Sequence, residues 1–306
     1  MLSVIIPAYN EEKMIPLTVS TLSDILNEAK IGHELLFVDD GSSDSTWEQI
    51  NEAAKTNPSV RGLHFSRNFG KEAAMFAGLE KAAGDACVVI DCDLQHPPEK
   101  IVEMYRLWEQ GYEVVEGIKA DRGTETGLHR FAANSFYKLI SGASGQNMSD
   151  ASDFKLLDRK VVDTLNAMPE RNVFFRALSF WVGFKKATVS YEVRDRVEGE
   201  SKWNTKKLIR YAITNITSFS CAPLHIITWL GVLMLAATVI FSIITLIQKI
   251  AGVAAPGFTT VIILLGFGFS VIMISLGIIA YYLGKVYEEI KGRPRYIISE
   301  TCGGNK

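Results

Sequence analysis

The sequence predicts an α/β fold with a mostly parallel sheet, followed by a membrane-anchoring module. Short apolar runs alternate with helical patterns in the first part of the chain, and two long apolar runs without Asp, Glu, Lys or Arg come later, at residues 224–247 and 258–283. Alternation of short apolar runs with helices is typical of buried parallel strands covered by helices on both faces. Each long run, if helical, exceeds the roughly 30 Å hydrocarbon core of a bilayer.

The expected elements follow one another at short intervals. Apolar runs predict strands at 3–7, 34–38, 60–65, 86–90 and 111–115. The patterns between them predict a helix up to about residue 30 and then helices at 45–55, 71–82 and 98–109. Residues 117–127 are charged and contain glycine, which predicts a mobile loop, and a helical pattern returns over 128–140.

These segments divide the chain into four expected parts. They are a cytoplasmic head at 1–200, an amphipathic juxtamembrane helix at 201–223, a transmembrane hairpin at 224–284 and a cytoplasmic tail at 285–306. The pattern at 203–219 is typical of a helix in the headgroup layer, although a surface helix packed on the head would look similar.

Basic residues predict the orientation of the hairpin. They flank the two spans on their outer sides, whereas the connecting loop carries only Lys249, so both termini should be cytoplasmic. The first residues lack the basic and apolar pattern of a secretory signal, which gives the same expectation for the head.

Composition excludes several other classes of protein. The formal net charge of -2 argues against a nucleic-acid-binding protein, which would usually carry a basic excess. The four cysteines show no CxxC spacing, so we expect reduced thiols and no zinc site. No GxGxxG pattern follows the first strand, which disfavours a dinucleotide site.

Acidic side chains follow two of the predicted strands. Asp91 and Asp93 come directly after 86–90, at the carboxyl edge of the sheet where ligands bind in such folds. Two hard oxygen ligands there, with Gln95 as a third, would hold Mg²⁺ or Mn²⁺ against a diphosphate. A solvated strand-to-helix turn would carry the same residues and is the alternative.

A second acidic turn, residues 39–44, follows the strand at 34–38. A carboxylate there would accept hydrogen bonds from ribose hydroxyls or a base N–H, and Tyr9 offers a ring face to a nucleobase. Capping of the next helix by Ser43 or Asp44 is the competing interpretation.

Five motifs carry a family resemblance. They are SVIIPAYNEE at 3–12, VDDGSSD at 38–44, RNFGK at 67–71, DCDLQHPPE at 91–99 and EGESKW at 198–203. Together they resemble the family 2 glycosyltransferases that load a sugar onto a polyprenyl phosphate, in particular the bactoprenol glucosyltransferase and dolichyl-phosphate mannose synthase group. The resemblance covers essentially the full chain, with a departure at Trp203, where the family usually shows Tyr.

The resemblance implies a GT-A fold and a role for each matching position. Donor contacts fall on Pro7, Tyr9, Glu11, Asp40, Lys71 and Asp91. The metal falls on Asp91, Asp93 and Gln95. Contacts to the acceptor phosphate fall on Arg122, Arg130, Arg194, Arg196, Ser201 and Lys202. Catalytic roles fall on Asp93, Asp153, Arg122 and Arg130.

Asp153 could act as a general base, as an orienting residue or only as part of the structure. A phosphomonoester has a second pKa near 6, so a lipid phosphate is already a nucleophile at neutral pH. We therefore favour an orienting role.

The expected activity is an inverting, metal-dependent transfer of a hexose from a nucleotide-sugar to a polyprenyl phosphate such as undecaprenyl phosphate. It would occur at the cytoplasmic membrane face and serve cell-surface glycan modification. UDP-glucose is the first choice of donor, with N-acetylhexosamine, mannose or an aminoarabinose derivative left open. The resemblance also implies a homo-oligomer, a tetramer. A processive synthase is disfavoured by the lack of QxxRW and of further spans, and a non-catalytic nucleotide-binding membrane scaffold by the intact acidic and basic positions.

Overall fold

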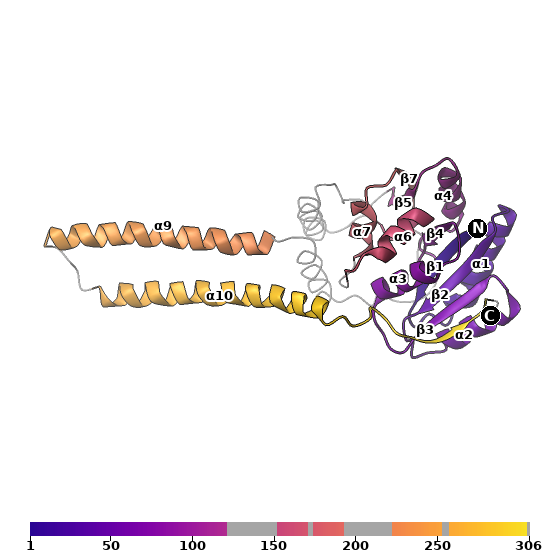
Figure 1. Cartoon of the computed structure of the whole chain (residues 1–306), viewed down its shortest axis with the longest axis horizontal. Helices are drawn as coiled ribbons and strands as arrows, with labels where there is room; N and C mark the ends of the chain where they lie inside the picture. Colours follow the sequence, from indigo (N-terminus) through magenta and orange to yellow (C-terminus); the bar gives the residue numbers. More distant parts are fainter. Residues whose placement is uncertain (121–151, 171–173, 193–221, 253–256, 305–306) are drawn as a thin grey trace. The chain divides into compact units, whose positions relative to one another are not determined.

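The computed structural model of the chain describes residues 1–120, 152–170, 174–192, 222–252 and 257–304. The chain forms two compact units, one made of Met1–Lys207 with Pro294–Lys306 and the other of Leu208–Arg293. The first unit is an α/β domain built on an eight-stranded sheet in the order β7-β5-β6-β4-β1-β2-β3-β8 (Figure 1).

Four adjacent parallel strands form the centre of the sheet. They are β1 (Leu2–Ala8), β2 (His33–Asp39), β3 (Val60–Phe65) and β4 (Ala86–Val89). The sequence predicts all four within one residue at each end, because each is a short, largely apolar run whose residues are mostly buried. The connecting helices, also predicted, are α1 (Met14–Glu28), α2 (Thr46–Thr56), α3 (Lys71–Lys81) and α4 (Glu99–Glu109).

The remaining strands make the sheet mixed, although parallel pairings still outnumber antiparallel ones as the sequence predicts. β5 (Val114–Lys119) pairs in parallel with β7 (Lys186–Tyr191), whereas β6 (Lys155–Asp158) is antiparallel to both β4 and β5. β5 begins three residues later than the strand expected at 111–115. Gly111, with φ of 88°, instead continues the turn that ends α4.

Helices cover both faces of the sheet. α1, α2 and α4 lie on one face, and α3 lies on the other with α6 (Arg159–Ala167) and α7 (Phe175–Trp181) (Figure 1). α3 approaches β1 closely because residue 78 is glycine: a Cβ there would lie 2.3 Å from Cγ2 of Ile5. This packing places the first residue of α3, Lys71, at the carboxyl edge of the central strands.

The C-terminal segment belongs to the head. Residues 285–306 are a separate tail in the sequence prediction, but β8 (Ile298–Cys302) pairs antiparallel with β3 and completes the sheet. The pattern Ile-Ser-Glu-Thr-Cys is short and half polar, so it gives little indication of a strand.

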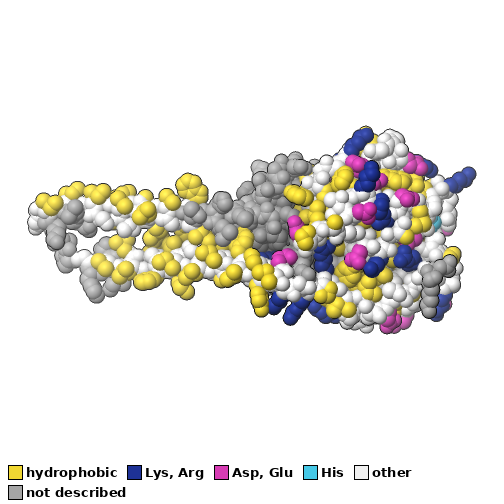
Figure 2. Space-filling view, in the orientation of Figure 1, with side chains coloured by type: hydrophobic (Ala, Val, Ile, Leu, Met, Phe, Trp, Pro, Cys, Tyr) yellow, Lys and Arg dark blue, Asp and Glu magenta, His cyan; other side chains and the backbone are white. Residues whose placement is uncertain are grey.

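The second unit contains two long helices that lie side by side, α9 (Ala222–Ile250) and α10 (Phe258–Ile290) (Figure 1). Hydrophobic side chains cover them, whereas charged side chains gather on the head (Figure 2). Within the described residues, one stretch, Leu264–Ile290, is long and apolar enough to cross a membrane, and Trp229–Ile244 is a shorter apolar helix. The helices expected at 128–140 and 203–219 lie outside the described residues.

Candidate active site

The loops that follow β1 and β2 are tied together at the carboxyl edge of the sheet. The Asn10 N–H donates to the Ser42 hydroxyl at 2.9 Å, and the Asn10 side-chain oxygen accepts the Ser43 N–H at 2.9 Å. Asn10 has φ of 55°, a left-handed conformation that Asn tolerates better than most residues. Three positions of the predicted nucleoside pocket lie in β1 and its loop: Pro7, Tyr9 and Glu11.

Asp40 joins this pair of loops to the loop after β3. Its carboxylate accepts the N–H groups of Phe69 at 2.6 Å and Gly70 at 2.9 Å. Burial raises the pKa of Asp40 to about 6, even though these hydrogen bonds favour the ionised form. The next residue is Gly41, with φ of 64°, where a Cβ would lie 2.4 Å from the Arg67 carbonyl carbon. The predicted nucleoside positions therefore lie on loops held at a fixed spacing.

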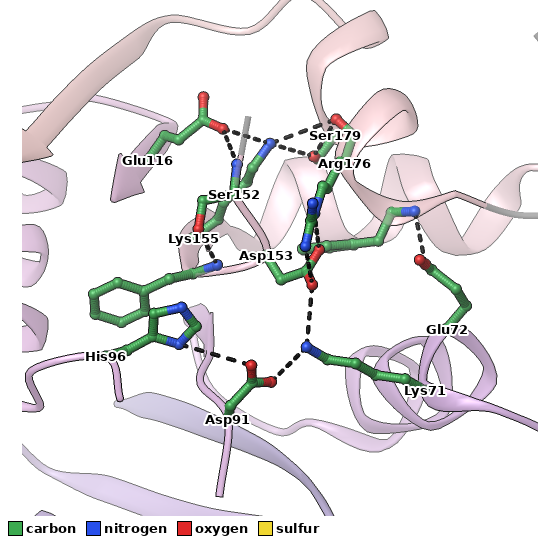
Figure 3. Close-up of polar contacts among 12 residues, drawn as sticks. Lys71, Glu72, Asp91, His96, Glu116, Ser152, Asp153, Lys155, Arg176 and Ser179 are labelled. Atoms are coloured by element: carbon green, nitrogen blue, oxygen red, sulfur yellow. Dashed lines mark hydrogen bonds and ion pairs between the residues drawn. The ribbon is translucent and has the colours of Figure 1, made fainter. Parts of the chain in front are cut away.

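Lys71 lies at the centre of an ionic network beside these loops (Figure 3). Its ammonium group is 2.6 Å from Oδ1 of Asp91 and 3.1 Å from Oδ2 of Asp153. Burial alone would lower the pKa of Lys71, but the two carboxylates outweigh it and raise the pKa. Three residues singled out from the sequence, on α3, after β4 and before β6, thus meet around one cation.

Arg176 on α7 is a member of this network that sequence reasoning missed. Its Nε and Nη2 donate to the two oxygens of Asp153 at 2.6 and 2.8 Å, which is a bidentate pair. Burial would raise the pKa of Asp153, but Lys71 and Arg176 together hold it well below its usual range. The signal in the sequence is a single arginine within the apolar run 173–181. A carboxylate held by two cations is a poor proton acceptor at neutral pH.

Glu72, on α3, forms a hydrogen bond with the first residue of α7. One of its carboxylate oxygens accepts the N–H of Phe175 at 2.8 Å. Burial, with the nearby charge of Asp153, raises the pKa of Glu72. Because Phe175 precedes Arg176, this contact fixes the start of the helix that presents the guanidinium to Asp153.

A buried ion pair holds the backbone on either side of Asp153. Lys155 in β6 is 3.0 Å from a carboxylate oxygen of Glu116 in β5 and donates to the hydroxyl of Ser179 on α7 at 2.9 Å. The same Glu116 oxygen accepts the N–H of Ser152 at 3.0 Å (Figure 3). These contacts join β5, β6 and α7 on either side of the Asp153 backbone, so its carboxylate has a fixed position.

The three predicted metal ligands lie on one turn after β4. The Asp91 carboxylate faces Lys71, with Nδ1 of His96 4.0 Å away, and the Asp93 carboxylate accepts the Gln95 N–H at 3.1 Å. No group of three or more His, Cys, Asp or Glu within the described ranges is arranged around a common metal position. Asp91, Asp93 and Gln95 all offer oxygen donors, which are the ligands that Mg²⁺ and Mn²⁺ prefer. Asp91 already pairs with a cation, the ammonium group of Lys71.

The residues predicted to contact the acceptor phosphate lie outside the described residues. They are Arg122, Arg130, Arg194, Arg196, Ser201 and Lys202. Their roles stay predictions.

Comparison with known proteins identifies the family. The model of glycosyl transferase family 2 matches residues 3–165. An uncharacterized glycosyltransferase of Bacillus subtilis, YkcC, is 39% identical over 98% of this chain and 94% of its own length. A prophage-derived bactoprenol glucosyl transferase of Shigella flexneri is 37% identical over 99% of both chains. A crystal structure of glucosyl-3-phosphoglycerate synthase from Mycobacterium tuberculosis is 22% identical, covers 71% of this chain and 79% of that one, and has a TM-score of 0.47, a similarity too distant for functional argument. The chain belongs to glycosyl transferase family 2 and is a glycosyltransferase.

Proposed function

We propose that this glycosyltransferase transfers a hexose, with glucose from UDP-glucose as the first candidate, to a polyprenyl phosphate such as undecaprenyl phosphate, with inversion at the anomeric carbon. One observation carries the proposal. Lys71 pairs with Asp91, one of the predicted metal ligands, and with Asp153, which Arg176 also contacts. The relatives of this chain over its full length include proteins named bactoprenol glucosyl transferase. A site that brings two phosphate-bearing reactants together needs fixed cations of this kind.

The donor half of the reaction would use the loops after β1, β2 and β3. Asp40 and the ring of Tyr9 are candidates for contacts to the nucleoside, and Lys71 for contact to the diphosphate. Mg²⁺ or Mn²⁺ held by Asp91, Asp93 and Gln95 would neutralise charge that develops on the nucleoside diphosphate as it leaves. The ammonium of Lys71, already oriented by Asp153, would be drawn toward the same oxygens.

The acceptor half does not require a strong base. A phosphate monoester of a lipid is largely dianionic at neutral pH and can attack the anomeric carbon directly, in line with the leaving diphosphate. The low pKa of Asp153 supports an orienting role, because a carboxylate paired with Lys71 and Arg176 holds those cations and does not take up a proton. Arg122 and Arg130 remain candidates for binding the acceptor phosphate.

Chain connectivity supports a membrane hairpin. The described residues up to 192 and from 294 onward belong to the same compact head, so any membrane crossings between them must be even in number. Two crossings, by α9 and α10, satisfy this condition, and the basic residues outside the spans favour a cytoplasmic head and cytoplasmic termini. An acceptor that is itself a lipid gives the hairpin a purpose beyond anchoring. A homo-oligomer, the tetramer implied by the family, stays a prediction.

A donor panel tests the proposal. Purified full-length protein in lipid nanodiscs containing undecaprenyl phosphate would receive radiolabelled UDP-glucose, UDP-N-acetylglucosamine, GDP-mannose or a UDP-aminoarabinose derivative, with Mg²⁺ or Mn²⁺. We expect a labelled lipid product from one donor, and its loss in Asp93→Asn while nucleotide binding and folding persist. Nucleotide binding without transfer from any donor would favour the non-catalytic scaffold, and near-normal turnover of Asp93→Asn would refute the metal assignment.

A further inference from the structure

The segment that follows α10 returns to the head and packs along β3. His64 in β3 lies opposite Glu300 in β8. The backbone pairing continues past β8, since Ser66 donates its N–H to the carbonyl of Ile297 at 3.0 Å, and the Ser299 hydroxyl donates to the carbonyl of His64 at 3.1 Å. The contact therefore reaches the end of β3, where the loop toward Lys71 begins.

Two side chains just before β8 hold the segment in place. The ring of Tyr296 stacks on Phe65 with centroids 5.1 Å apart and planes 10° apart, and its hydroxyl donates to the carboxylate of Glu80 on α3. The guanidinium of Arg295 donates to the carbonyl of Met168 at 2.7 Å and lies over the ring of Phe76, 5.2 Å from its centroid. The segment is thus bound to α3 as well as to β3.

A first line of contacts runs from β8 to the loop after β2. Nε1 of Trp47 donates to Oε2 of Glu300 at 3.0 Å, and the indole of Trp47 stacks on His64 with centroids 5.1 Å apart. Nδ1 of His64 is 2.7 Å from Oδ2 of Asp39, whose other oxygen accepts the N–H of Ser42 at 3.1 Å. Ser42 is the residue that accepts the Asn10 N–H, so this line ends in the proposed nucleoside pocket.

A second line runs through aromatic rings to Asp40. Phe65, on which the ring of Tyr296 stacks, also forms a T-shaped pair with Phe69, with centroids 5.8 Å apart. The Phe69 N–H donates to the Asp40 carboxylate, and Gly70 then leads directly into Lys71 and α3. Without β8, β3 would be an edge strand with unpaired backbone groups, and the loop at 66–70 would lose the partner on its outer side.

We propose that the C-terminal segment, residues 295–302, is a positioning element for the donor half of the site. It acts through Glu300 and Tyr296, which hold the loop that carries Asp40 and the loop that leads into Lys71, and it does not itself touch the substrate. The inference rests on the proposed function, because it assigns the segment to the nucleotide side of that same reaction. The affinity for the nucleotide should therefore depend on residues that follow the membrane helices.

Two tryptophans provide a matched test. Trp47→Phe removes the hydrogen bond to Glu300, and Trp108→Phe removes a hydrogen bond of the same kind, from Nε1 of Trp108 to Asp158 at 2.8 Å, elsewhere in the head. Glu300→Ala removes the Trp47 contact from its other end and serves if Trp47→Phe folds poorly. Each full-length variant would be titrated with nucleoside diphosphate in Mn²⁺, using whichever of UDP, GDP, CDP and ADP the wild-type protein binds most tightly.

We expect Trp47→Phe and Glu300→Ala to weaken nucleotide binding about fivefold and to raise the KM for the donor by a similar factor, with the KM for polyprenyl phosphate unchanged. The double variant should bind the nucleotide no more weakly than the single variant with the lower affinity, because both substitutions remove the same hydrogen bond. Trp108→Phe should bind the nucleotide with wild-type affinity, even if its thermal stability falls as much as that of Trp47→Phe. Equal affinity in all variants would overturn the inference alone, whereas a wild-type protein that binds none of the four nucleotides would overturn the proposed function on which it rests.

Discussion

Replacing Arg176 with methionine would leave the Asp153 carboxylate with one cationic partner instead of two. The variant loses the bonds of 2.6 and 2.8 Å and keeps Lys71 at 3.1 Å as the ion-pair partner among the described residues. Removing one partner of a fully buried ion pair costs about 3–5 kcal/mol. The side chain of Asp153 is 8% exposed but that of Arg176 is 29% exposed, so water replaces part of the lost interaction. We expect a loss of about 2–3 kcal/mol at pH 7.

The loss of unfolding free energy in Arg176→Met should depend on pH, and the lowered pKa of Asp153 determines its direction. The pKa of Asp153 is lowered in the folded protein. Ionised Asp153 therefore stabilises the fold at pH values above its ordinary pKa of 3.8, and this stability is lost as the pH falls. The difference between wild type and Arg176→Met should therefore be full at pH 7 and shrink as the pH falls below about 4.

Thermal and urea unfolding of the full-length protein in detergent would measure the effect. A loss of 2–3 kcal/mol corresponds to a fall in Tm of about 4–12 °C for a domain of this size. Asp153→Asn in the Arg176→Met background should recover at least half of the loss, because it removes the uncompensated charge. Lys55→Met, which breaks an ion pair with Glu52 whose partners are 71% and 67% exposed, is the control and should change stability little.

A stability of Arg176→Met within about 0.5 kcal/mol of the Lys55→Met control, the usual range for a surface substitution, would contradict a compensating role for Arg176. The same role would be contradicted by a loss that persists undiminished at low pH, or by a double variant that Asp153→Asn makes less stable still. Any of these results would mean that Arg176 does not compensate the charge of Asp153.

Three further outcomes follow from the site. Lys71→Met should lower transfer about 100-fold, as loss of a preorganised charge at a reacting diphosphate does, and turnover within tenfold of wild type would exclude that role. Because burial raises the pKa of Asp40 to about 6, its neutral form contributes stability that is full below pH 3.8 and lost as the pH rises through 6. Asp40→Asn should remove this fall between pH 4 and 7 in urea titrations, and an unchanged profile would contradict the assignment. Treatment with EDTA should abolish transfer without unfolding the protein, and Mg²⁺ or Mn²⁺ should restore it; activity that survives chelation would count against the metal.

The elements that could be predicted from the sequence are those whose own residues decide their structure. β1 to β4 are largely apolar runs whose residues are mostly buried, and such runs have few other stable arrangements. β6 and β8 are strands of four and five residues with polar positions, and their pairing with β4 and β3 depends on contacts remote in the sequence. The antiparallel strands were missed for that reason.

The same distinction separates the site residues. Asp40, Lys71 and Asp91 lie in motifs at strand ends, where both the pattern and the family resemblance point to them. Arg176 and Glu72 act through partners 23 and 103 residues away, across a helix of seven residues that has no strong pattern of its own. A charge inside an apolar run marks Arg176 as unusual, but only the folded structure, which brings α7 beside Asp153, reveals its partner.

The late position of β8 in the chain also affects how the protein is made. Its partner β3 ends at Phe65 and β8 begins at Ile298, so at 5–20 residues per second the ribosome takes roughly 10–50 s to supply the missing strand. During that time α9 and α10 are synthesised and the head has an open sheet edge, the kind of surface that invites wrong pairing. A nascent chain stalled at residue 293 should therefore be cleaved by protease near β3 more readily than the released protein, and equal resistance would show that the head matures before its last strand arrives.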